Sequence, residues 1–536
     1  MRRRVPIKAN SKIHHYLLEQ YKLFERSIFK MDWSQPAHPT VVQGTVVQGK
    51  VSNDYNQMGG SHYNQQKFNV QTGDGSYPKG EQQPNTFRDV FWAFLFIVHL
   101  FIILCLTAVF GPAAVDAANS GGYKQSNDYG GSVGGYQTGF GAVITNCMLC
   151  AMSAFVISAF SLFYTINCAR SVVTSGLLFQ CFMSFCFMLA MIASGSFMAI
   201  LGVLMFGWSV CYTWAIWHRI PFAAANLMTA TTAVKANSGL FGIAYLFLII
   251  GLLWTICWEI TATGSYMVTS NCDNDGNCSA MNGFLLFVLL LSFYWTHSVI
   301  QNTVHVTVAG TVGGWWFNPH QASSGCSRAV RGSLQRATTY SFGSICFGSL
   351  IVAVVRALRA MADMARDNEE GGTAILLCLI DCILGCIEGI VEYFNKWAYV
   401  YVGLYGYSFI ESGKNVLGLF KSRGWNTIVT DNLVESALFF VNVGIGLLTG
   451  CIGFILESSF GDMYGVFGDS DKIMGFVIGF VIGFVLSSIV MSTIESATNT
   501  VIVCFAEAPA EFEANHPQLS DQMRASWLTG YPDEYS

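Results

Sequence analysis

Aromatic side chains and ionisable groups occur together in two long apolar segments of this chain. They are Trp254, Trp258 and Glu259 in the first segment, and Tyr294, Trp295, His297 and Asn302 in the second. Aromatic faces and a carboxylate suit a quaternary ammonium ion, which has no N–H to donate and is recognised through cation–π contacts and charge. The alternative is that the tryptophans only anchor helices at the membrane interface, with Glu259 near the outer surface.

Several further ionisable groups interrupt apolar segments. An ionised side chain at the centre of a membrane helix costs about 2.5–3.5 kcal/mol on insertion scales, so such groups are usually paired or functional. Besides Glu259 and His297, this chain has Asp381, Glu388, Glu392 and Glu495 in such positions. A histidine titrates in the physiological range, which suits proton coupling. We therefore expect His297, or a buried acid such as Glu388, to handle protons.

Helices that cross a membrane must position these groups. The chain has 536 residues, a mean hydropathy of +0.44 and only 11% charged residues, whereas soluble domains average roughly 25%. Runs of about 20 apolar residues predict membrane-spanning helices. The fold class is therefore an all-α integral membrane protein with about ten transmembrane helices in a bundle. The expected spans are 89–110, 141–165, 172–194, 196–217, 239–261, 282–305, 339–360, 374–394, 433–457 and 472–495.

The pattern divides the chain into three parts. Residues 1–86 are polar and are expected to form a disordered cytoplasmic tail. Residues 87–504 are expected to form a ten-helix transmembrane domain, and 505–536 a cytoplasmic C-terminal tail. Lys and Arg fall mainly in alternate loops, which places both termini in the cytoplasm. Arg356 and Arg359 conflict with this topology, because they fall near the outer end of the seventh span.

The eighth span is the weakest of the ten. It contains Asp381, Glu388 and Glu392, so the sequence leaves open whether it crosses the membrane fully. Cys378, Cys382 and Cys386 share one face of the same helix. This spacing admits a metal or lipidation site, but packing is the favoured interpretation.

One loop on the predicted outer side has features that are typical of segments exposed to an oxidising compartment. Cys272 and Cys278 flank a short polar stretch and are expected to form a disulfide, with two free thiols as the alternative. Asn277 begins the glycosylation sequon Asn-Cys-Ser.

No catalytic constellation is evident, so we expect a protein that is not an enzyme. The segment Gly44–Lys50 resembles a phosphate-binding loop, but the following residue is Val51, and no strand or helix flanks the match. No cofactor and no metal are expected. A net charge of −5 on so long a chain does not suggest nucleic-acid binding.

Four segments resemble the choline transporter-like family, and within it the fungal pH-nine-sensitive branch. They are AGTVGGWWF at Ala309–Phe317, GSICFGSLIVAVVRALR at Gly343–Arg359, NKWAYVYVGLYGYSFIESGK at Asn395–Lys414 and VIVCFAE at Val501–Glu507. The likeness extends over roughly residues 87–513. It implies ten helices, cytoplasmic termini, and uptake or exchange of choline-like cations at the plasma membrane.

Other positions favour the fungal branch over the animal one. Animal members have a long, glycosylated first outer loop with cysteines, whereas Gly111–Phe140 is short and has neither cysteine nor sequon. Ile410 and Gly413 likewise differ from the residues usual in animal members.

These observations predict a plasma-membrane transporter for choline or a related organic cation, by facilitated or proton-coupled movement. Its expected partners are a small cationic substrate and membrane lipid. Two other classes stay open: a membrane scaffold or stress-response protein without transport, and a channel.

Overall fold

The computed structural model describes residues 85–121, 136–194, 198–269, 283–367, 372–423, 432–460 and 471–531, and these residues form helices and no strands. Each of the ten expected spans corresponds to one long helix. These helices are α2 (Val90–Gly121), α3 (Tyr136–Asn167), α4 (Ala169–Ala193), α5 (Met198–Ile216), α7 (Gly239–Thr269), α8 (Gly283–Phe317), α10 (Phe342–Asp367), α11 (Gly372–Tyr405), α14 (Leu433–Phe460) and α15 (Asp471–Glu507). The helical form follows from lipid as the solvent, because backbone groups find no other partners there.

Nine stretches of the described chain are long and apolar enough to cross a membrane. One of them, Ala199–Ala236, continues through α5, η1 (Trp217–Arg219) and α6 (Ile220–Ala236). The eighth expected span, α11, has 34 residues but falls outside this set. The predicted fold class, an all-α membrane protein, is confirmed.

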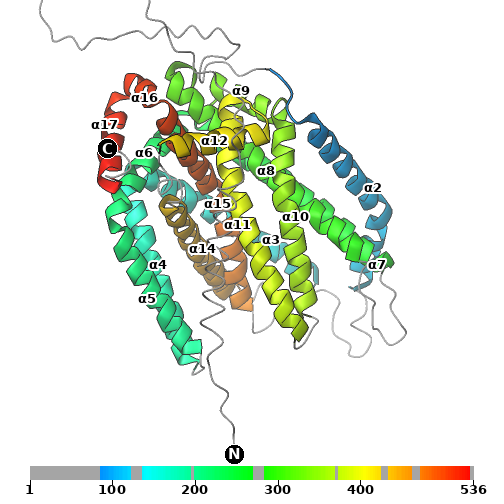
Figure 1. The fold of residues 1–536 in the computed structure, drawn as a ribbon. Coiled ribbons are helices and arrows are strands. Elements are labelled where there is room, and N and C mark those ends of the chain that lie inside the picture. Colours follow the sequence, from blue (N-terminus) through cyan, green and yellow to red (C-terminus); the bar gives the residue numbers. More distant parts are fainter. Residues whose placement is uncertain are drawn as a thin grey trace, which may run out of the picture. The chain divides into compact units, whose positions relative to one another are not determined.

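Short helices gather near one end of the long ones (Figure 1). They are α6, α9 (Arg328–Thr338), α12 (Phe409–Arg423), α16 (Pro509–Asn515) and α17 (Pro517–Gly530), with η2 (Pro319–Gln321) between α8 and α9. The sequence had not separated α6 as an element. Its side chains are mostly buried, and it packs against α15 and α17.

Helices α14 and α15 approach closely along glycine faces. A Cβ atom placed on Gly479 would lie 2.5 Å from the backbone oxygen of Thr449, and one on Gly475 would lie 2.8 Å from that of Gly453. Only residues without a side chain permit such contact. The small-residue pattern in these two spans is therefore a packing surface.

Arg88 and Asp89, the two charged residues just before α2, form hydrogen bonds with the segment that connects α11 to α12. Gly406 has a positive φ of 65° there, a conformation that glycine adopts readily. Arg88 Nε donates to the Gly406 carbonyl at 3.3 Å. The Asp89 carboxylate accepts from the backbone N–H of Phe409 at 3.0 Å and from the hydroxyl of Ser344 at 2.6 Å. Asp89 thus caps the N-terminus of α12, where a negative charge is favourable.

Candidate functional site

Aromatic rings from α2, α7 and α8 meet between these helices. The His99 ring stacks on Trp295, with centroids 5.0 Å apart, and lies 6.1 Å from the Trp254 ring. His99 Nε2 is 2.8 Å from the Ser292 hydroxyl. Trp295 is buried, and its indole N–H donates to the Cys346 carbonyl at 2.9 Å. We call the rings of His99, Trp254 and Trp295 the aromatic cluster.

The other predicted aromatic residues continue this arrangement along α7 and α8. The Trp258 ring is 4.8 Å from Phe293, which in turn lies 4.3 Å from His297 and 5.5 Å from Tyr294. The indole N–H of Trp258 donates to the Leu289 carbonyl at 2.8 Å. That of Trp254 is buried and has no hydrogen-bond partner among the described residues.

The bonding of His297 accommodates either protonation state. Its Nδ1 donates to the Phe293 carbonyl at 3.0 Å, and its Nε2 is 3.1 Å from the Thr255 hydroxyl. That hydroxyl also lies 2.8 Å from the Gly251 carbonyl. A neutral imidazole would accept from Thr255, whereas an imidazolium would donate to Thr255 and leave its hydroxyl hydrogen for Gly251.

Two predicted site residues lie apart from the aromatic cluster. Glu259 is exposed on α7, because consecutive side chains point about 100° apart around a helix. Asn302 is further along α8, where its amide donates to the Ser349 hydroxyl at 2.9 Å. Ser349 is in turn 3.2 Å from the hydroxyl of the buried Tyr399.

Sequence reasoning did not assign His99 to the site. The sequence did point to His99, because it is the sole histidine in the first apolar run, which has no Asp, Glu, Lys or Arg. Its neighbours come from segments distant in sequence, and only the packing of α2 against α7 reveals them.

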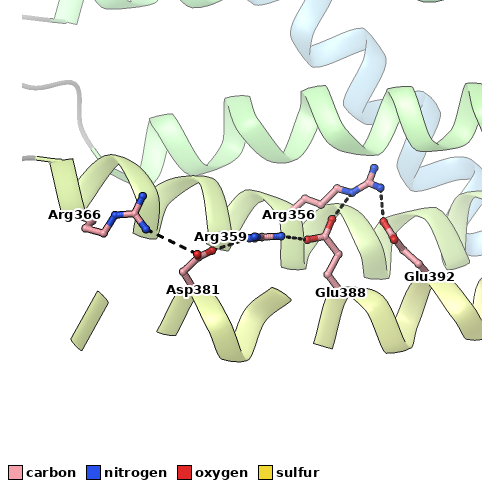
Figure 2. Close-up of polar contacts among 6 residues, drawn as sticks. All are labelled: Arg356, Arg359, Arg366, Asp381, Glu388 and Glu392. Carbon is pink, nitrogen blue, oxygen red and sulfur yellow. Dashed lines mark hydrogen bonds and ion pairs between the residues drawn. The ribbon is translucent and has the colours of Figure 1, made fainter. Parts of the chain in front are cut away.

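Six charged side chains form a ladder between α10 and α11, which Figure 2 shows. They are Arg356, Arg359 and Arg366 of α10, and Asp381, Glu388 and Glu392 of α11. Glu388 occupies the centre: one oxygen is 2.9 Å from Arg356 Nε and the other 2.9 Å from an Arg359 guanidinium nitrogen. Arg356 also pairs with Glu392, and Arg359 Nε lies 2.6 Å from Asp381.

This ladder accounts for the charges that conflicted with the expected topology. Arg356 and Arg359 do not stand alone in the C-terminal half of α10, since each has carboxylate partners on α11. The cost of an ion in lipid falls when an opposite charge neutralises it. Each helix thus supplies opposite charges that lower the cost of burying the ionised groups of the other.

The predicted disulfide of Cys272 and Cys278 and the sequon at Asn277 lie outside the described residues. They stay predictions. The same holds for the tail before residue 85.

The comparisons with known proteins agree on one family. A family model described as plasma-membrane choline transporter matches residues 200–510. The protein PNS1 of Eremothecium gossypii is 27% identical over 340 residues, which are 61% of this chain and 60% of the relative. A CTL-like protein of Dictyostelium discoideum is 28% identical over 467 residues, which are 84% of this chain and 78% of the relative. PNS1 of Cryptococcus neoformans is 29% identical over 460 residues, which are 79% of this chain and 80% of the relative.

Proposed function

Because this chain belongs to the choline transporter-like family, we propose that it carries choline or a related organic cation across the plasma membrane. The family is one of membrane transporters, and the long apolar helices suit a multi-pass member. The substrate, the coupling to protons and the cytoplasmic position of both termini are parts of this proposal. The Lys and Arg bias of the loops supports the orientation.

The observation that carries the substrate assignment is the aromatic cluster. Quaternary ammonium groups bind to aromatic faces, because their methyl groups carry positive charge but no hydrogen-bond donor. Trp254, which is only partly buried, offers such a face, and it lies beside His99, whose ring stacks on the buried Trp295. The unpartnered indole N–H of Trp254 suits the hydroxyl group of choline.

The remaining predicted residues have supporting roles in this proposal. Trp258 and Tyr294 extend the aromatic surface through Phe293. Glu259, which is exposed, attracts the cation through its charge instead of by contact. Asn302 belongs to the polar network of Ser349 and Tyr399 deeper between α8 and α10.

Two predicted groups are candidates for proton handling. His297 has an arrangement that serves both of its protonation states. Glu388 is ionised in the pairs it makes with Arg356 and Arg359, so it takes up a proton only if these pairs open. Of the two, His297 is nearer to the aromatic cluster, because it follows Trp295 by two residues on α8 and lies 3.1 Å from Thr255, the residue after Trp254.

Equilibrium binding to the purified protein tests the substrate assignment. Choline should bind more tightly than ethanolamine, which has a primary ammonium group and needs hydrogen-bond acceptors. Trp254→Ala should weaken choline binding by about 2- to 30-fold, the range of cation–π contributions of about 0.5–2 kcal/mol. The matched control is Trp214→Ala, since Trp214 is 83% exposed on α5. Equal choline affinity of the two folded variants would refute the assignment.

A further inference from the structure

A small cavity lies where α6, α11, α14 and α15 meet. Its volume of about 20 Å³ is enough for one water molecule. The polar side chains on its wall include Asn226 of α6, Lys396 of α11, Glu435 of α14, and Glu495 and Asn499 of α15. None of the roles assigned above uses this cavity.

Two buried amides on the wall lack partners. Asn226 is fully buried, and its oxygen accepts from the indole N–H of Trp527 at 2.9 Å, which fixes the orientation of the amide. Its NH₂ group then has no hydrogen-bond partner among the described residues, and neither does that of Asn499, which is 5% exposed. Buried polar groups in proteins are nearly always hydrogen-bonded. The wall is therefore built to hold an acceptor such as water.

The charges around the cavity do not cancel. Lys396 Nζ is 3.0 Å from Glu435, so these two charges neutralise each other. Glu495 experiences both of them and makes no ion pair within the described residues. His305 of α8 lies 3.1 Å from the hydroxyl of Ser496, the residue that follows Glu495.

Among the described residues, the charges that act on Glu495 are those of Glu435 and Lys396. The described residues of α3 contain no charged side chain, and the only charge of α6 is Lys235 at its far end. A lone carboxylate inside a membrane bundle must be neutralised by a cation or a proton. The cavity is too small for an organic cation, and the fixed NH₂ group of Asn226 disfavours a metal ion.

We propose that Glu495 takes up and releases a proton through the water that fits this cavity, and that this is a protonation site of the transporter. The proton moves from solution to one carboxylate oxygen of Glu495 and returns by the same route. Glu435, whose side chain is 48% exposed, connects the cavity to the surface. The coupling role rests on the proposed transport function, whereas the protonation itself does not.

Labelling with dicyclohexylcarbodiimide tests protonation without reference to transport. This reagent modifies protonated carboxyl groups in apolar surroundings. In the full chain, mass spectrometry should find the adduct on Glu495, and its yield should rise as the pH is lowered from about 8 to about 5. Glu411, exposed on α12, is the control and should stay unmodified. Absence of the adduct on Glu495 over this range, in folded protein, would overturn the proposal.

Choline uptake by Glu495→Gln tests the coupling. Glutamine has the shape of the protonated acid, so the variant should fold and transport choline without responding to a pH gradient. Glu411→Gln should respond as the parent does. If Glu495→Gln keeps the full gradient response, the coupling role is wrong and the transport proposal stands. If the parent takes up no choline but Glu495 is labelled, the transport proposal fails and the protonation site stands.

Discussion

At the residue scale, the predicted site residues are of two kinds in this account: aromatic side chains that touch the cation, and an exposed carboxylate that acts on it only through its charge. Trp254, Trp258, Trp295 and His297 lie along two neighbouring helices, as their positions on apolar segments suggested. The exposure of Glu259 was not evident from sequence, because it depends on which face of α7 packs inward. Burial, more than residue type, decides how strongly a charge acts.

Glu259→Gln should therefore raise the KM for choline less than Trp258→Ala. An exposed charge contributes up to about 1 kcal/mol, which is roughly fivefold at most. A lost aromatic face costs about 2- to 30-fold. Kinetics of uptake by both variants provide the comparison. A larger effect of Glu259→Gln would mean that its carboxylate touches the cation.

The surroundings of His516, which lies between α16 and α17, predict that the stability of these C-terminal helices depends on pH. Its ring stacks on Trp315 at 4.0 Å, and Nε2 donates to the Trp315 carbonyl at 3.3 Å. Burial lowers the pKa of His516, although this hydrogen bond opposes the shift. The folded state thus prefers neutral His516. Its contribution to stability is present above the ordinary value of about 6.5 and is lost as the pH falls through the lowered pKa.

Hydrogen exchange of α17, corrected for the intrinsic rate, should accordingly increase below about pH 6.5. His516→Gln should remove most of this pH dependence. Helix α9 serves as the internal reference, since it lacks histidine. Identical pH profiles for the variant and the parent would contradict the assignment to His516.

At the element scale, hydropathy alone located nearly all of the long helices. Uninterrupted apolar runs in lipid have no alternative to helix, so their identity was predictable. The separate helix α6 was not, because its burial against α15 and α17 is a tertiary effect. The charges of α11 made that span ambiguous until the partner arginines of α10 were known.

The ladder predicts coupled effects on stability. Arg356→Gln and Glu388→Gln should each lower the Tm of the purified protein by a few degrees, because each leaves a half-buried charge with one partner fewer, Glu388 keeping Arg359 and Arg356 keeping Glu392. The double variant should be less unstable than the sum of the two. Glu411→Gln is the control on an exposed carboxylate. Strict additivity in this cycle would show that the pair contributes no interaction energy.

At the scale of the whole molecule, the tail and the helical domain have separable roles in this account. Arg88 and Asp89, at the start of the helical domain, bind the break before α12. The family and the transporter class were recognisable from four short segments. The aromatic cluster and the cavity at Glu495 were not, because each joins helices that are distant in sequence.

A truncation that removes residues 1–86 should keep choline flux near that of the full chain, because it spares Arg88 and Asp89. Asp89→Ala in the full chain should reduce flux, since the N-terminus of α12 loses its cap. Uptake per folded molecule is the quantity to compare. A truncated chain that folds but has lost its activity would favour the scaffold function.

The central claim is best tested by uptake of labelled choline into proteoliposomes that contain the full chain, with and without an imposed pH gradient. The account predicts saturable uptake that increases when the gradient is applied. Uptake no greater than that of empty liposomes, from protein shown to be folded, would contradict it.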